Sequence, residues 1–140
     1  EFRRVLFRSY TRYEFLADTG GAGQFRGGMG VARDIQFLDQ SGMLNTQFDK
    51  FKVAPFGLFG GADGACGSLT LERQGEVVNL ASKTVNQDLR KGDIISMQTQ
   101  GGGGFGDPSK RDEQMVRRDL REGKVSPQCA QQNHGVGPKE

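Results

Sequence analysis

The sequence is poor in the residues on which metal and disulfide sites are commonly built. Its 140 residues contain no tryptophan, one histidine and two cysteines. Cys66 and Cys129 lie far apart and form no CxxC pair, and His134 has no second ligand at metal-binding spacing. Neither a zinc site nor a disulfide framework is therefore indicated. We expect two reduced thiols, no metal bound by this chain, and a cytoplasmic location.

Long hydrophobic runs are also missing. No stretch approaches the ~20 apolar residues that span a membrane, and no signal peptide is recognisable, so we expect no membrane partner. Hydrophobic residues make up only 34% of the chain. This leaves little material for a core, and the chain is expected to be a piece of something larger. In such a piece Phe56, Leu58 and Phe59 should be exposed, in a patch where the remaining part docks.

A surplus of charge of one sign disappears once residues 1–9 are set aside. This peptide, EFRRVLFRS, does not fit the pattern that follows it and resembles the conceptual translation of a sequencing-library adapter. We expect a scar there, with Phe2, Val5 and Phe7 outside any shared core; an authentic amphipathic strand is the alternative. Without this peptide, basic and acidic residues are equal in number. That balance argues against a nucleic-acid partner.

Glycine is abundant, with 22 residues in the chain, concentrated in three segments at 18–30, 54–65 and 101–106. The first segment does not match G-x-G-x-x-G, and strand-like alternation follows it where a Rossmann fold requires a helix. No Walker motif occurs, and the single Arg26-Gly27-Gly28 is poor support for an RNA-binding RGG tract. The glycine segments are therefore not nucleotide motifs of a familiar kind. The simplest interpretation of the last one is a tight strand-to-helix turn.

Short alternating segments separated by glycine turns predict a predominantly β body. Strands are expected at 10–16, 31–38, 43–53, 67–73, 76–80, 83–89 and 93–99. A helix should run from Pro108 to Glu122, capped by Asp107, and a second should begin at Ser126-Pro127 and end near Gly135. The predicted fold class is α+β, with glycine-rich loops and one or two short C-terminal helices.

Together these segments resemble the hydantoinase B/oxoprolinase family. Residues 18–30 look like that family's D-S-G-G-A-G-x-[YF]-R-G-G-x-G signature, and 55–61 match its P-x-G-L-x-G-G stretch. Further matches are Ser82-Lys83, Lys91-Gly92-Asp93, Gly101 to Pro108, Arg111-Asp112, Val116, Asp119, Gly123, Val125-Ser126, Ala130 and Gly135-Val136. Lys50, Gln100 and His134 depart from the usual Arg, Pro and Tyr. The resemblance makes 10–137 the C-terminal portion of a longer domain, with 138–140 as a tail.

The resemblance implies a function that a larger enzyme carries out. In this family an A-type partner subunit or domain binds ATP, with Mg implied, and phosphorylates the substrate carbonyl oxygen. The B-type part then completes the opening of a cyclic amide such as 5-oxoproline or a hydantoin, or the carboxylation of a ketone in acetone-carboxylase relatives. A metal in those relatives lies upstream of the matched region. The resemblance thus implies a small-molecule substrate and an A-type partner.

Two of the glycine segments, residues 18–30 and 101–107, are the candidate site. They combine backbone N–H groups with the cation of Arg26, and such concavities bind anions or developing negative charge. We expect the two loops to lie near each other, with Arg26 and Asp18 organising the region; the alternative is that these two residues only brace turns. The candidate residues are Asp18, Arg26, Gly27, Gly28, Gly101, Gly102, Gly103, Gly104 and Asp107.

Three hypotheses from different classes result. The first is a fragment of a B-type hydrolase or carboxylase subunit, inactive alone. The second is a β-rich interaction module without chemistry. The third, a nucleic-acid binder, is opposed by the neutral charge balance.

Overall fold

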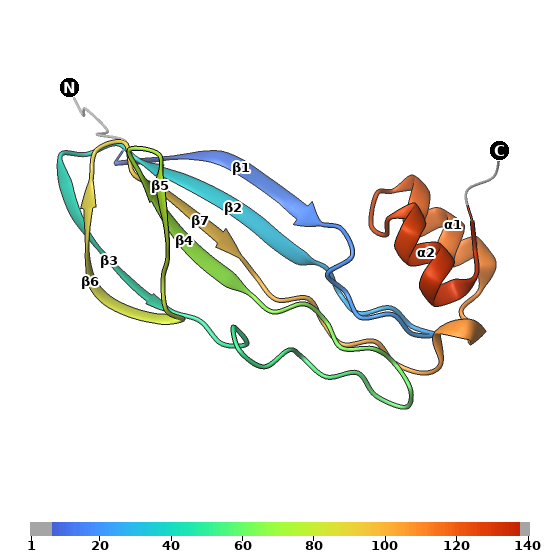
Figure 1. The fold of residues 1–140 in the computed structure, drawn as a ribbon. Helices are drawn as coiled ribbons and strands as arrows, with labels where there is room; N and C mark the ends of the chain where they lie inside the picture. The colour runs from blue at the N-terminus through green and yellow to red at the C-terminus, as the bar shows by residue number, and fades with distance from the viewer. Residues whose placement is uncertain (1–6, 138–140) are drawn as a thin grey trace, which may run out of the picture. The chain divides into compact units, whose positions relative to one another are not determined.

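The computed structural model describes residues 7–137 and shows a β-dominated α+β fold with two short helices near the C-terminus (Figure 1). The chain divides into two compact units. The first, which we call the strand unit, comprises residues 7–14, 32–49 and 68–98. The second, the glycine unit, comprises residues 15–31, 50–67 and 99–137. The predicted fold class is confirmed.

Two antiparallel sheets form from the alternating segments. The larger has five strands in the order β1-β2-β7-β4-β5, and the smaller pairs β3 with β6. The strands are β1 (Arg8–Leu16), β2 (Gly30–Phe37), β3 (Ser41–Gln47), β4 (Ser68–Arg73), β5 (Glu76–Asn79), β6 (Lys83–Arg90) and β7 (Ile94–Gln98). Each of the seven predicted strands is therefore present, with shifted ends.

Apolar side chains at every second position hold the five-stranded sheet together. The strand register aligns Ile35 of β2, Ile95 of β7, Leu71 of β4 and Val78 of β5 in one row across four strands. Leu71 and Ile95 are buried, as is Leu69. Directly opposed side chains of this kind are the unit of sheet stabilisation. The alternation seen in the sequence thus has its direct counterpart in the packing.

A buried carboxylate fixes the turn between β6 and β7. Asp93 is 2% exposed and accepts hydrogen bonds from Arg73 Nη2 at 2.6 Å and from the Arg90 N–H at 2.8 Å. The hydrogen bond from Arg73 lowers the pKa of Asp93, and burial, which opposes the charged form, does not cancel it. The Gly92-Asp93 pair that the sequence matched to the family is thus a structural brace in this unit.

The strand predicted at 43–53 is shorter in the structure. It ends at Gln47, and Lys50 has a φ of 61°. A left-handed residue departs from the extended backbone of a regular strand. The Lys50 carbonyl instead accepts a hydrogen bond from the Gly67 N–H at 3.0 Å. The sequence pattern showed no sign of this turn because lysine is uncommon in such a conformation.

The helix predicted from Pro108 to Glu122 is interrupted. A short 3-10 helix, Pro108–Lys110, is followed by extended backbone, and α1 (Glu113–Arg121) begins only after Asp112. Asp112 caps α1 by accepting from the Gln114 N–H at 2.8 Å. The sequence holds two successive cap signals, and the prediction used the first for the whole helix.

The second helix follows the prediction closely. α2 (Pro127–His134) is capped by the Ser126 side chain, which accepts from the Cys129 N–H, and it ends at Gly135 with φ 67°. Between the helices Val116, Val125 and Ala130 are buried. This small cluster is the side-chain core of the helical part of the glycine unit.

The N-terminal peptide is only partly described. Phe2 and Val5 lie outside the described residues. Phe7 is 51% exposed, its carbonyl accepts from the Leu38 N–H, and β1 begins at Arg8. The proposed adapter origin of residues 1–9 stays a prediction.

Candidate functional site

The three glycine-rich segments lie side by side in the glycine unit. Residues 19–28, 55–65 and 99–106 are joined by backbone hydrogen bonds, and their extended traces run next to each other in Figure 1. We call this assembly the glycine layer. The structure therefore brings the two predicted loops together and adds a third segment that was not expected to lie with them.

The layer has a regular register of three residues. Two sets of three residues, one from each segment, are hydrogen-bonded through their backbones at 2.7 to 3.0 Å. The first triplet is Thr19, Ala65 and Gly101, and the second is Ala22, Ala62 and Gly104. In each segment the members of the two triplets are three positions apart. A left-handed extended helix with three residues per turn has no internal hydrogen bonds, so its N–H and C=O groups are free to bond neighbouring segments. The period indicates packing of this type.

Glycine is required in the layer because the backbones approach closely. A Cβ built at many of its positions would come within 3.0 Å of a carbonyl oxygen of another residue, a distance that real Cβ atoms essentially never show. These positions include Gly21, Gly27, Gly61, Gly64, Gly101, Gly103 and Gly104. Gly28 is different, because a Cβ there would meet no atom within 4 Å. The glycines thus serve close packing.

Most of the predicted anion-binding N–H groups are engaged in this packing. The N–H groups of Gly27, Gly101, Gly102 and Gly104 donate to backbone carbonyls at 2.8 to 3.0 Å. Gly28 supplies the carbonyl that accepts from Gly102. An anion at these positions would have to displace existing bonds. A direct anion contact by the loops stays a prediction.

Asp18 ties the start of the layer to the segment before α2. Its Oδ1 accepts from the Ser126 N–H at 2.8 Å, and its own N–H donates to the Lys124 carbonyl at 3.1 Å. Its φ is 60°, an uncommon value for a residue with a side chain. The hydrogen bonds of its carboxylate and of its backbone N–H hold Asp18 in this strained conformation.

Arg26 forms a buried ion cluster with two residues of the C-terminal part. Its Nε donates to Asp119 Oδ2 at 3.0 Å, and its Nη1 donates to the Gly27 carbonyl at 2.7 Å. Arg111 Nη2 donates to the same Asp119 oxygen at 2.7 Å. Side-chain exposure is 14% for Arg26, 6% for Arg111 and 7% for Asp119. The cluster locks the first glycine segment to α1.

The ionisation of Asp119 follows from this cluster. Burial opposes its charged form, but the hydrogen bonds and charges of Arg26 and Arg111 outweigh burial and lower the pKa of the carboxyl. Asp107, the other predicted site carboxylate, caps the 3-10 helix through Ser109, whose hydroxyl and N–H lower the pKa of Asp107. Both aspartates are therefore anchored structurally.

Asp119 and Arg111 were not predicted as partners of Arg26. A usable signal was present, because Asp119 lies three positions after Val116 and directly before Leu120, on the apolar side of the helix. A carboxylate on a buried stripe needs a cation.

The described residues offer little space for a substrate beside this cluster. A cavity of about 30 Å³ in the glycine unit is lined by Asp18, Gly20, Ala22, Arg26, Val125, Cys129, Asn133 and His134. This is room for about one water molecule. The ring of His134 is held at its Nδ1, 2.9 Å from the Pro108 carbonyl oxygen. The cavity is too small for a cyclic amide.

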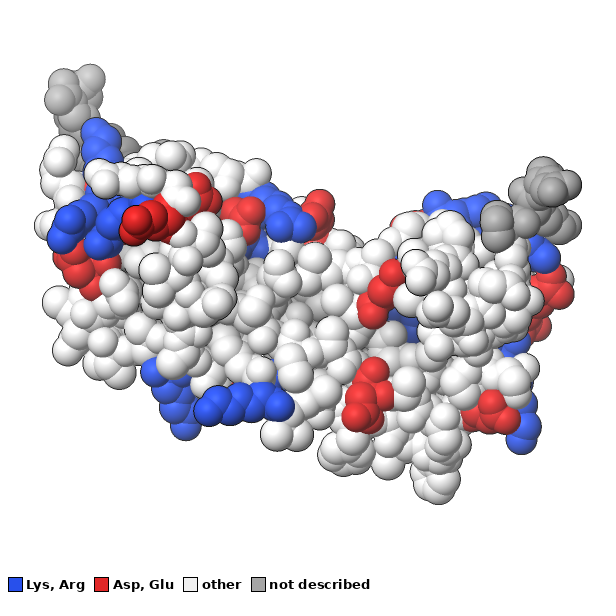
Figure 2. Space-filling view, in the orientation of Figure 1, with Lys and Arg blue, Asp and Glu red and all other residues white. Residues whose placement is uncertain are grey.

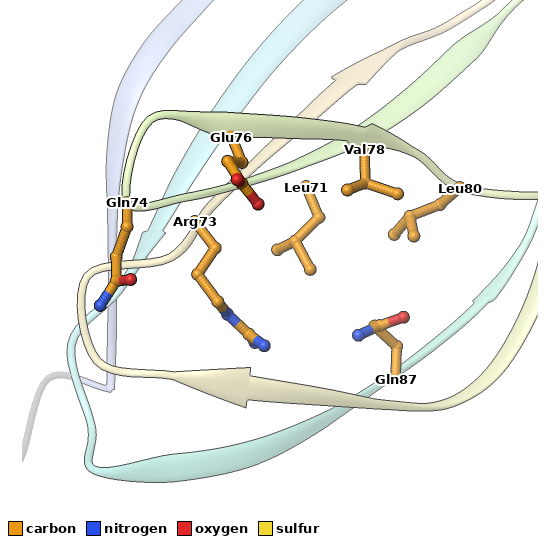
Figure 3. Close-up of a pocket in the computed structure, with 7 residues that line it drawn as sticks. All are labelled: Leu71, Arg73, Gln74, Glu76, Val78, Leu80 and Gln87. Atoms are coloured by element: carbon orange, nitrogen blue, oxygen red, sulfur yellow. The ribbon is translucent and has the colours of Figure 1, made fainter.

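Larger hollows lie in the strand unit. One of about 380 Å³ lies between the β4–β5 hairpin and β6, and Figure 3 shows Leu71, Val78 and Leu80 directed toward Gln87 of β6. Arg73, Gln74 and Glu76 complete its lining. A second hollow, of about 400 Å³, is lined mainly by residues of β2, β3, β6 and β7. No predicted site residue lines either hollow within the described chain.

Metal donors and single-sign charge are not prominent in residues 7–137. No group of three or more His, Cys, Asp or Glu side chains within this range could hold a metal ion. None of its helices is long and apolar enough to cross a membrane. On the face drawn in Figure 2, charged side chains of both signs lie in small groups separated by uncharged areas.

The sequence model of the family described as hydantoinase B/oxoprolinase matches residues 8–108. The chain belongs to this family. Similar proteins include MJ0963 of Methanocaldococcus jannaschii, 36% identical over 89% of this chain, and the B-type component of a putative D-/L-hydantoinase from a Pseudomonas species, 34% identical over 89%. The 5-oxoprolinase of Dictyostelium discoideum is 37% identical over 63% of this chain and 7% of its own length. This hydantoinase B/oxoprolinase chain spans only about a fifth of the length of the first two relatives, 22% of one and 21% of the other.

Two solved structures share the fold of this chain. The ATP-dependent caprolactamase of Pseudomonas jessenii superposes with a TM-score of 0.79 at 25% identity, covering 95% of this chain and 24% of its own. An acetone carboxylase in a nucleotide-free structure has the same TM-score at 20% identity, covering 93% of this chain and 22% of its own. The second likeness shows the fold alone.

Proposed function

We propose that this chain is part of the B-type subunit of an ATP-dependent amidohydrolase that opens cyclic amides such as 5-oxoproline or hydantoins. The observation that carries the proposal is the family match over residues 8–108, together with relatives named as a B-type hydantoinase component and as 5-oxoprolinases. Since the chain spans about a fifth of the hydantoinase relative, the activity belongs to the complete protein.

The chemistry divides between two proteins in this proposal. An A-type partner binds ATP and Mg and phosphorylates the amide oxygen, which converts a resonance-stabilised amide into an electrophile with a good leaving group. The B-type subunit positions the activated ring and stabilises charge while water attacks. A metal, where one is used, is bound upstream of this chain. The proposed compartment is the cytoplasm, consistent with free Cys66 and Cys129.

The proposal is tested with the complete subunit and its A-type partner. ADP release and ring-opened product are measured with 5-oxoproline, hydantoin and caprolactam, each with and without ATP. We expect ATP-dependent opening of at least one cyclic amide. ATP-dependent consumption of acetone with bicarbonate, and no amide opening, would identify a ketone carboxylase instead. No turnover of either class would favour an interaction module.

Within this function we propose that Arg26 and Asp18 are positioning residues. Both hold the glycine layer against the C-terminal part, by the Asp119 and Ser126 contacts. In the complete enzyme, Arg26→Ala should lower kcat with a smaller change in KM, and Arg26→Lys should restore part of the loss. If Arg26→Ala keeps full activity, or loses activity only because it unfolds, as seen by circular dichroism, then the role of Arg26 is structural alone.

A further inference from the structure

The glycine layer carries a cluster of exposed aromatic side chains. The rings of Phe59 and Phe105 are 5.1 Å apart between centroids, and those of Phe25 and Phe105 are 6.2 Å apart. Leu58 lies beside Phe105 through a β-bridge. We call Phe25, Leu58, Phe59 and Phe105 the aromatic patch. Its members are between 45% and 79% exposed, and none carries a charge.

The backbone beneath the patch is fixed rather than flexible. Phe25 and Phe105 exchange two backbone hydrogen bonds of 3.0 and 2.9 Å, and the Leu58 N–H donates to the Gly104 carbonyl at 2.9 Å. Phe59 has a φ of 52°, in the left-handed region that is unfavourable for a residue with a side chain. The chain therefore accepts backbone strain at the most exposed phenylalanine of the patch. A strained, rigid and apolar surface of this kind is typical of a contact site.

We propose that the aromatic patch is the docking surface for the remaining part of the same B-type subunit, through an apolar segment of that part. The relatives are about four times as long as this chain, so most of their apolar material lies outside it. An uncharged occupant fits because the patch offers no ion-pair partner. Burial of these three phenylalanines and one leucine would contribute strongly to the fold of the complete subunit.

Phe56 supports the same assignment from a neighbouring position. It lies on the segment that carries Leu58 and Phe59 and is 68% exposed. Phe56, Leu58 and Phe59 were expected from the sequence to be exposed, and the structure confirms this. Phe25 and Phe105 are added by the structure, because the glycine layer brings three distant segments together.

The test measures the accessibility of the patch in the complete subunit. Phe59→Cys is introduced, and reaction with a thiol reagent is followed at that site by mass spectrometry, relative to the same protein unfolded in denaturant. Lys91→Cys, at an exposed polar turn, is the control. We expect Phe59→Cys to react at least about tenfold more slowly than the control in the subunit without its partner, since a docked segment must open first. Phe25→Cys repeats the measurement if Phe59→Cys fails to fold.

Each other outcome overturns the proposal. Fast reaction in the isolated subunit but protection after adding the A-type partner would assign the patch to that partner. Protection that appears only at high protein concentration would assign it to a second copy. Fast reaction in all cases would show a free surface. The inference rests on the chain being part of a B-type subunit, but the labelling does not depend on activity, so its failure is separable from failure of the proposed function.

Discussion

The strand unit and the glycine unit are each stabilised internally, but in opposite ways. In the strand unit, side chains at alternating positions meet across strands, as in the row from Ile35 through Ile95 to Leu71. In the glycine layer, backbones meet directly because side chains are missing. The first unit is therefore sensitive to the removal of side-chain atoms, and the second to their addition.

Both units nevertheless use a buried aspartate paired with arginine. Asp93 is bound by Arg73 in the strand unit, and Asp119 by Arg26 and Arg111 in the glycine unit. Each carboxylate accepts hydrogen bonds from arginines of other segments of its unit. The units thus differ in whether side chains or backbones pack together, but both contain a buried Asp–Arg ion pair.

The largest effect is expected from adding one methyl group to the glycine layer. In Gly104→Ala the new Cβ would collide with the Ala22 carbonyl, and the backbones would have to separate. We expect a loss of more than about 3 kcal/mol in the free energy of unfolding. Denaturant titration of the complete subunit measures it.

Gly28→Ala is the matched control for this prediction, because its Cβ would enter open space. It should change stability by less than about 0.5 kcal/mol. Equal losses for the two variants would contradict the close-packing interpretation of the layer.

Asp119→Ala should have the next largest effect. It leaves Arg26 and Arg111 buried without their common partner, and breaking a buried pair in this way costs about 3 kcal/mol or more. Thermal unfolding of the complete subunit is the measurement. Glu113→Ala, which removes an exposed ion pair with Arg117 on the same helix, should change little. A similar loss for Glu113→Ala would show that helix stability, rather than the cluster, is being measured.

Leu71→Ala tests the strand unit by the reverse change. Leu71 is buried but lines the hollow of Figure 3, so part of the cavity is present already. We expect a loss of about 2 kcal/mol, and about 3 kcal/mol for Leu69→Ala, which is 1% exposed and does not line that hollow. Equal stability of Leu71→Ala and the unchanged protein would mean that this row contributes nothing.

The smallest effect concerns pH. The folded-state pKa of Asp93 is lowered, so its contribution to stability is present above the unfolded pKa of about 4 and is lost as pH falls through the folded value. Asp93→Asn should therefore flatten the decline of Tm below about pH 4 while lowering Tm near neutrality. An unchanged acid profile would assign the decline to Asp119 or to exposed carboxylates.

The strand unit could be predicted well from the sequence, because its side chains alternate. The strand predicted at 83–89 is found at Lys83–Arg90. In the helical part of the glycine unit, the cap of α2 at Ser126 was predicted in the same way. These signals are local and involve propensity and periodicity alone.

The glycine layer could be predicted only in part. That the segments at 18–30 and 101–107 lie together was expected, but the participation of 55–65 was not, because glycine leaves no periodic pattern. The partnership of Arg26 with Asp119 spans 93 positions and depends on how α1 is oriented. Lys50 and Phe59, with their left-handed backbone, carry no local signal either.

The register of three residues in the glycine layer sets a rule for changes in length. Inserting or deleting one residue in 19–22 or 101–104 would rotate every later carbonyl by a third of a turn and point it away from its donor. A change of three residues would keep each group facing its neighbour. Surface loops commonly tolerate insertions and deletions of any length, whereas these three segments can lengthen or shorten only in whole turns of three residues.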